Sequence, residues 1–103
     1  MSKLKLSPNP TFTAKVPIPI PGGEPVLVEF TFKHRTRDDF RAWLTSGAER
    51  DDTQTILEAA TAWELDDKFD EPNVGRLVQN YIGAPAAVVQ TYITELAKAR
   101  EKN

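Results

Sequence analysis

Two runs of apolar residues at helical spacing, separated by an acidic turn, occupy the chain between Asp52 and Tyr81. Both follow the i, i+3, i+4 pattern of amphipathic helices: Ile56, Leu57, Ala60 and Trp63 in the first, and Val74, Leu77, Val78 and Tyr81 in the second. A helix with such a stripe needs another element to cover it. We therefore expect a helix pair at the centre of the fold, with Trp63 as a core residue in the angle between the two helices.

Residues 11–33 show the alternation of apolar and polar side chains that is typical of half-buried strands. The apolar residues that point to one face are Phe12, Ala14, Val16, Ile18, Ile20, Val26, Val28, Phe30 and Phe32. The segment Pro21–Pro25, which contains two glycines, has the composition of a turn. This pattern predicts a β-hairpin over residues 11–33.

Pro17 and Pro19 restrict how the hairpin can pair with other strands. Residues two apart direct their backbone groups to the same side of a strand, and proline has no N–H to donate. The first strand therefore keeps both prolines on its outer edge, which is closed to another strand. The outer edge of Val26–Lys33 carries no proline. We expect either a strand of a second chain or a helix of this chain to cover it.

Capping residues mark the starts of two helices. Thr36 is placed to cap a helix that contains Phe40 and Trp43, and we expect Gly47 to end that helix. Asp70 is placed to cap the helix that follows the acidic turn.

Glycine and proline positions divide the remaining helical part. Gly75 lies inside a helix, where we expect a neighbouring element to approach closely. Gly83 closes that helix and Pro85 begins the last one. The chain is therefore assigned to the α+β class, with an N-terminal β-hairpin followed by a small bundle of about four helices. We expect a single domain over residues 1–103, with a flexible N-terminus (1–10), the hairpin (11–33) and a helical part (36–103).

Composition excludes several classes of protein. The chain is 40% hydrophobic and 27% charged, as in ordinary globular proteins, and no apolar run is long enough to cross a membrane. It has no cysteine, which excludes disulfides and thiolate metal sites and fits a reducing cytoplasm. The net charge of −2 provides no general attraction for nucleic acid or for anionic lipid.

The residues needed for catalysis or metal binding do not occur in a recognisable arrangement. His34 is the only histidine, and no nucleophile-elbow motif is present. The acidic turn Glu64–Glu71 lacks the ligand spacing of a calcium loop. We therefore expect no enzymatic activity, no metal and no cofactor.

One cluster of positive charge stands out at the end of the hairpin, formed by Lys33, His34, Arg35, Arg37 and Arg41. Most such clusters are solvated surface. Arg35 and Arg37, however, flank a helix start, where positive charge is unfavourable. A residue that breaks a local rule without local benefit indicates a partner. We assign Arg35, Arg37 and Arg41 as candidate partner-binding residues.

Several segments spread over nearly the whole chain resemble the small tail assembly chaperones of long-tailed bacteriophages and prophages. They are PNPTFTAKVPIPIPGGEP from Pro8, FTFKHRTR from Phe30, WEL from Trp63 with NVGRL from Asn73, NYIG from Asn80, and the C-terminal LAKAREKN.

This resemblance implies a non-enzymatic role in the host bacterial cytoplasm. Such chaperones bind the long helical tape measure protein and keep it soluble, help the tail tube protein to polymerise around it, and are absent from the mature virion. As our own hypothesis, the open edge of the hairpin or the region of Arg35 and Arg37 contacts a second copy of the chain or the tube protein. No contact with membranes or nucleic acid is implied.

An alternative interpretation remains open from the residues alone. A small phage-encoded regulator could bind nucleic acid through the basic segment Lys33–Arg41, and its binding would depend steeply on salt.

Overall fold

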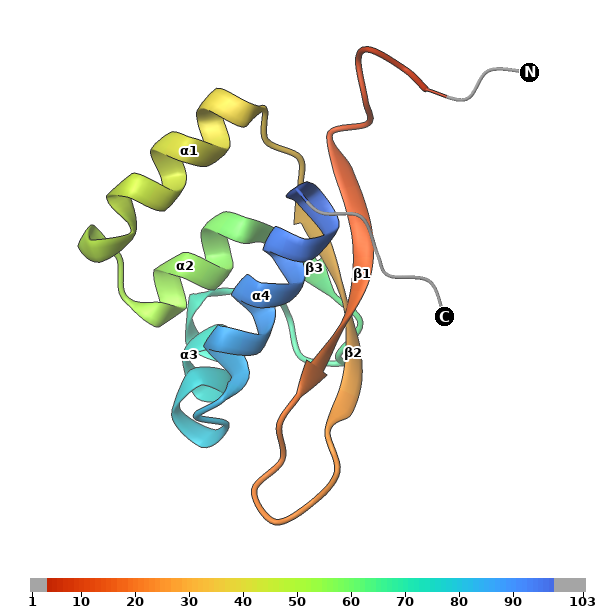
Figure 1. The fold of residues 1–103 in the computed structure, drawn as a ribbon. Helices are drawn as coiled ribbons and strands as arrows, with labels where there is room; N and C mark the ends of the chain where they lie inside the picture. The colour runs from red at the N-terminus through yellow and green to blue at the C-terminus, as the bar shows by residue number, and fades with distance from the viewer. Residues whose placement is uncertain (1–3, 98–103) are drawn as a thin grey trace.

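The computed structural model describes residues 4–97 and combines a small sheet with four α-helices. In chain order the elements are β1 (Thr11–Ile18), β2 (Val26–Lys33), α1 (Arg37–Thr45), the 3-10 helix η1 (Ser46–Glu49), α2 (Asp52–Ala59), β3 (Ala60–Trp63), α3 (Glu71–Asn80) and α4 (Ala84–Ala97). The helices lie on one side of the sheet (Figure 1). The predicted α+β class, a hairpin followed by helices, is confirmed.

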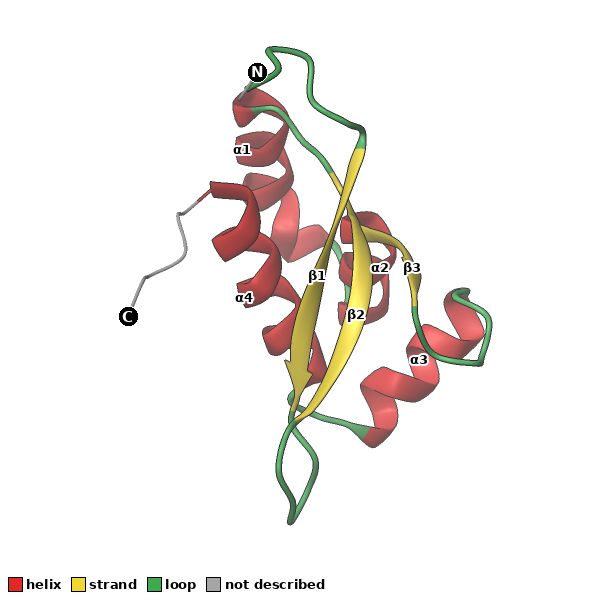
Figure 2. Ribbon diagram, turned by 90° about the vertical axis from the view of Figure 1, so that its right-hand side faces the viewer, coloured by secondary structure: helices red, strands yellow, loops and turns green. Residues whose placement is uncertain are grey.

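β1 and β2 form the predicted antiparallel hairpin, in a register from Thr11 opposite Lys33 to Ile18 opposite Val26. Gly22 adopts φ +75° in the turn, a conformation that L side chains rarely take. The face turned toward the helices buries Ala14, Val16, Ile18, Val28, Phe30 and Phe32. The other face is open to solvent, as expected for an antiparallel sheet covered on one side (Figure 2).

Tyr92 of α4 is the aromatic side chain around which the core packs. It is fully buried, and its ring lies 5.1 Å from that of Phe32 and 5.5 Å from that of Trp43, measured between centroids. Phe12 and Phe40 also contact it, at 6.2 Å and 6.0 Å. The core therefore joins the sheet to α1 and α4.

The expectation of a simple helix pair between residues 52 and 81 is wrong. α2 ends at Ala59, and Ala60 adopts extended backbone angles as the chain enters β3. β3 pairs antiparallel with β2 opposite Phe30, Thr31 and Phe32, with a bulge in the ladder. The unpaired backbone of β2 offers Ala60–Trp63 a row of hydrogen bonds, and this tertiary pairing prevails over the local helical pattern.

β3 also changes the position expected for Trp63. The indole is half-buried, and its ring meets that of Phe30 edge-on at 5.9 Å. Trp63 therefore packs against the core from the edge of the sheet, and does not fill an angle between two helices. Strand pairing by this chain's own β3, and not by a helix, covers part of the β2 edge.

Both predicted N-caps are present. The Thr36 hydroxyl accepts a hydrogen bond from the Asp39 N–H at 3.1 Å, and the Asp70 carboxylate accepts one from the Asn73 N–H at 3.0 Å. The predicted stop at Gly47 is wrong, because α1 ends at Thr45 and the chain continues directly into η1. Gly47 lies within η1 and no positive φ is required there.

The close approach expected at Gly75 occurs instead at Gly83. A methyl group built on Gly75 would lie 3.9 Å from the Thr53 hydroxyl, an ordinary contact. On Gly83 it would lie 2.8 Å from Cγ of Pro19, too close for two non-bonded carbon atoms. The segment between α3 and α4 therefore fits against the hairpin only because residue 83 has no side chain.

None of the helices within residues 4–97 has the length and apolar character required to cross a lipid bilayer.

Replacing Gly83 by alanine should destabilise the protein. The added methyl group forces Pro19 or the α3–α4 segment to move, and overpacking of this kind costs about 1–3 kcal/mol in the free energy of unfolding. Urea denaturation followed by circular dichroism measures the change.

Gly75→Ala is the matched control. The site has room for the methyl group, and alanine is a better helix former than glycine, so this variant should gain about 0.5–1 kcal/mol. Equal effects of the two substitutions would contradict the contact assigned to Gly83.

Candidate functional site

Arg35, the first of the three candidate partner-binding residues, is partly buried and bonded to other groups of the protein. Its guanidinium donates hydrogen bonds to the Glu58 carbonyl at 2.9 Å and to the Tyr92 hydroxyl at 3.0 Å. It also lies 4.8 Å from the centre of the Trp43 ring, within range of a cation–π interaction. These intramolecular contacts compensate for the unfavourable position of a positive charge near the start of α1, and the sequence alone did not reveal them.

A second arginine that sequence reasoning missed completes this cluster. The Arg50 guanidinium lies 4.4 Å from the centre of the Trp43 ring and donates to the Trp43 carbonyl at 2.7 Å. The indole N–H of Trp43 in turn donates to the Glu58 carboxylate at 3.0 Å. Arg50 was not predicted, because no helical or strand periodicity relates it to Trp43 and to Glu58, with which its guanidinium forms an ion pair at 3.6 Å.

Arg37 and Arg41 lie on the exposed surface of α1. Within residues 4–97, neither guanidinium has a hydrogen-bond or ion-pair partner. The structure thus separates the three candidates: Arg35 faces the core, and the other two face solvent together with the acidic side chains of Asp38 and Asp39.

His34 does not form part of a catalytic arrangement in the described residues. It is exposed and shares a shallow surface hollow with Arg35 and Trp43, where Asp39 is the one carboxylate. No charged side chain of residues 4–97 is fully buried. In the same part of the chain, no three histidine or acidic side chains gather in a group that could hold a metal ion.

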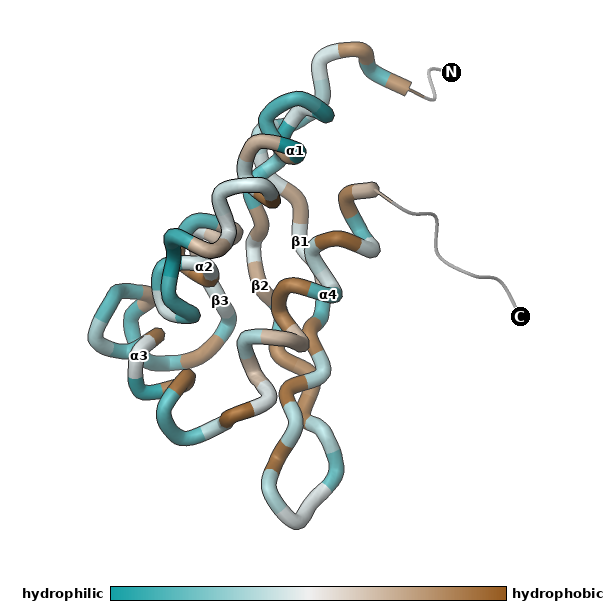
Figure 3. The backbone as a smooth tube through the Cα atoms, turned by 60° about the vertical axis from the view of Figure 1, so that its left-hand side comes forward, coloured by the Kyte–Doolittle hydropathy of each residue, from teal (hydrophilic) through white to brown (hydrophobic). Residues whose placement is uncertain are grey.

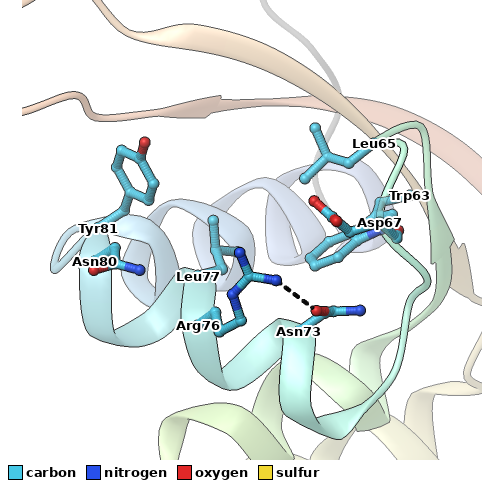
Figure 4. Close-up of a pocket in the computed structure, with 8 residues that line it drawn as sticks. All are labelled: Trp63, Leu65, Asp67, Asn73, Arg76, Leu77, Asn80 and Tyr81. Atoms are coloured by element: carbon cyan, nitrogen blue, oxygen red, sulfur yellow. Dashed lines mark hydrogen bonds between the residues drawn. The ribbon is translucent and has the colours of Figure 1, made fainter.

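A hollow of the surface lies between α3 and the loop that follows β3 (Figure 4). It encloses about 290 Å³. We call it the α3 groove, and its lining residues are Trp63, Leu65, Asp67, Asn73, Arg76, Leu77, Asn80 and Tyr81. Apolar side chains come from both sides of the groove, and polar groups surround them.

Three contacts of the loop hold the groove in shape. The Trp63 indole N–H donates to the Asp67 carbonyl at 2.7 Å, and the Asn73 amide donates to the Lys68 carbonyl at 2.8 Å. The Phe69 ring meets Trp63 edge-on at 5.1 Å. These contacts tie the loop between β3 and α3 at both of its ends.

The chemistry available in the α3 groove is that of binding. Trp63, Leu77 and Tyr81 provide apolar and aromatic surface, and Leu65 is 38% exposed at its margin. Arg76 donates to the Asn73 side chain at 3.0 Å, so its charge is already oriented at the rim. Such a groove suits apolar side chains of a partner polypeptide, with hydrogen bonds at the edge.

Arg35 and Arg37 differ in burial and in hydrogen bonding, so their replacement should affect stability differently. Arg35→Ala should lower the free energy of unfolding by about 1–2 kcal/mol, because it removes two hydrogen bonds from a charged donor. Arg37→Ala should change it by less than about 0.5 kcal/mol, as is usual for an exposed residue without partners. Urea denaturation of both variants tests this, and a similar loss in both would contradict the assignment.

Comparison with known proteins identifies the family. No curated protein and no solved structure matches the chain. The profile of one family, described as phage tail assembly chaperone, matches residues 1–103, which is the whole sequence. An exposed groove with apolar walls is compatible with that description. The chain belongs to the phage tail assembly chaperone family.

Proposed function

We propose that this protein binds the phage tape measure protein, keeps it soluble, and promotes assembly of the tail tube around it. In this proposal it acts in the host cytoplasm, makes or breaks no covalent bond, and leaves before the virion is complete. Membership of the family over the full sequence supports a role in tail assembly. The feature that carries the finer proposal is the α3 groove.

The groove fits one side of an amphipathic client helix. A helix presents apolar side chains three and four residues apart, and a groove with apolar walls can take one or two of them. Trp63 and Tyr81 offer large surfaces with a polar group at one end, a type of residue enriched at binding sites. Covering client side chains in this way keeps them from other client molecules, which is how such a chaperone would prevent aggregation.

The exposed arginines of α1 have a separate role in this proposal. Arg37 and Arg41 face solvent without an intramolecular partner in residues 4–97, so they are available to acidic groups of the tail tube protein. Arg35 is used internally and would act only by supporting Trp43 and Tyr92.

The alternative of a nucleic-acid-binding regulator loses support from the same observations. Binding to phosphates depends on several free cations in one patch. Arg35 is engaged with Tyr92 and the Glu58 carbonyl, and the exposed acidic residues Asp38 and Asp39 lie between the remaining cations.

Co-expression with the tape measure protein tests the proposed function. The wild-type chaperone should increase the soluble yield of tape measure protein and co-purify with it. Leu65→Lys, which places a charge at the margin of the α3 groove, should reduce co-purification about tenfold or more, since burying an unpaired charge opposes binding.

Leu44→Lys is the matched control, because Leu44 is similarly exposed, at 46%, but lies on α1. This variant should bind as the wild type does. Equal loss in both variants would remove the groove from the proposal. If folded wild-type protein recovered no tape measure protein, the proposed function itself would fail.

A further inference from the structure

β2 has an edge that is only partly paired. β3 covers Phe30–Phe32, and the Glu64 N–H still donates to the Glu29 carbonyl at 3.0 Å. The Glu64 carboxylate accepts a hydrogen bond from the Glu29 N–H at 2.7 Å. If β3 were longer, a main-chain carbonyl would accept this hydrogen bond instead. Backbone pairing with β3 ends there. We call the remaining segment, Val26–Val28, the open β2 edge.

The backbone groups of Leu27 point outward from this open edge. Residues two apart in a strand direct their N–H and C=O groups to the same side. The backbone N–H and C=O of Glu29 bond toward β3. Those of Leu27 therefore point to the same side of β2, but β3 does not extend far enough to pair with them. Val26 and Leu27 are 51% and 58% exposed. Exposed apolar edges of this kind are sites where another strand pairs.

The N-terminal arm, which we define as Leu4–Pro10, has no sheet or helix structure and carries two strongly exposed leucines. Leu4 is 81% exposed and Leu6 is 95% exposed, with Lys5 between them. This alternation is that of a short amphipathic strand. Figure 3 shows the arm as alternating apolar and polar segments that extend away from the helices.

The arm cannot reach the open β2 edge of its own chain. The His34 N–H donates to the Pro10 carbonyl at 2.8 Å, so the arm is anchored at the end of the sheet farthest from the hairpin turn (Figure 1). Leu6 is four residues before Pro10, a reach of at most about 14 Å. Leu27 is seven residues from His34 along the sheet, about 23 Å away. An arm that pairs with this edge must come from another molecule.

Charge and polarity of the two segments are complementary. In an antiparallel pairing that continues the line of β3, Lys5 lies opposite Leu27, and Leu4 and Leu6 lie opposite Val28 and Val26. The lysine then shares the outer face of the sheet with Glu29, diagonally across the pair, and the leucines share the apolar face with the valines. Opposite charges and apolar pairs across strands both stabilise such an arrangement.

We propose that the N-terminal arm of one copy adds as an antiparallel strand to the open β2 edge of a second copy of this chain. Each copy has one arm and one open edge, so the contact is head-to-tail and produces rings or open chains of subunits. This contact uses a surface other than the α3 groove.

Molar mass in solution tests the proposal first. The full chain should show a weight-average mass that rises with concentration above 11.5 kDa, measured by sedimentation equilibrium. A chain lacking residues 1–9, and separately a full chain with Leu27→Pro, should both stay at the mass of one molecule. Proline at position 27 removes the outward N–H and leaves the pairing of β2 with β1 intact.

Cysteine cross-linking tests the register, and the absence of cysteine in the natural chain makes it specific. Leu6→Cys protein mixed with Val26→Cys protein should form a disulfide-linked pair under mild oxidation. Leu6→Cys mixed with Leu44→Cys is the control, since Leu44 has comparable exposure on α1, and it should not form the pair above background.

The proposal is overturned if the full chain stays monomeric at its highest soluble concentration, if the arm-deleted chain associates equally, or if both cysteine mixtures react alike. The arm-deleted chain should still co-purify with tape measure protein. A full chain that binds tape measure protein but does not self-associate would therefore contradict only the proposed arm contact. A full chain that does not bind tape measure protein would contradict the proposed function.

Discussion

The hydroxyl group of Tyr92 connects the last helix to the end of β2 and to the segment before α1. It donates a hydrogen bond to the Lys33 carbonyl at 2.7 Å and accepts one from Arg35 at 3.0 Å, while the ring is fully buried. One side chain of the last helix thus fixes the end of β2 and the turn into α1. Arg35 extends the connection to Trp43, against which Arg50 also packs. Without the hydroxyl group, the Lys33 carbonyl would lose its partner and Arg35 one of its acceptors. Such losses cost more than the net value of the hydrogen bonds.

The sequence predicted the features that depend on neighbouring residues. The hairpin follows from period-two alternation and a glycine-containing turn, and the caps at Thr36 and Asp70 follow from hydroxyl or carboxylate groups three residues before a free N–H. β3 was missed because its pairing partner lies about thirty residues earlier in the chain, and the spacing of Ile56, Ala60 and Trp63 suits a helix equally well. Local patterns carry no information about which strand edge is left unpaired.

The same distinction applies to the candidate site. The α3 groove was not predicted, because its location depends on where β3 leaves the sheet and how the following loop returns to α3. Arg35 was assigned to the surface because its partners, Glu58 and Tyr92, are 23 and 57 residues away. The exposure of Arg37 could be predicted, because it stands at a helix start beside acidic residues, and charged residues in such a position usually face solvent. The family resemblance required no such geometry, because it rests on segments spread over the chain.

Pro17 of β1 and Pro19, which directly follows that strand, have a consequence for how this sheet can associate with other sheets. Fibrils of the cross-β type propagate when every molecule offers two receptive flanks, so that hydrogen bonding continues through the stack. In this sheet, the flank of β1 that carries Pro17 and Pro19 has lost donors at alternate positions. Edge-to-edge stacking of whole sheets would therefore stop after two molecules. A pair formed in this way offers no second flank at which a fibril could grow.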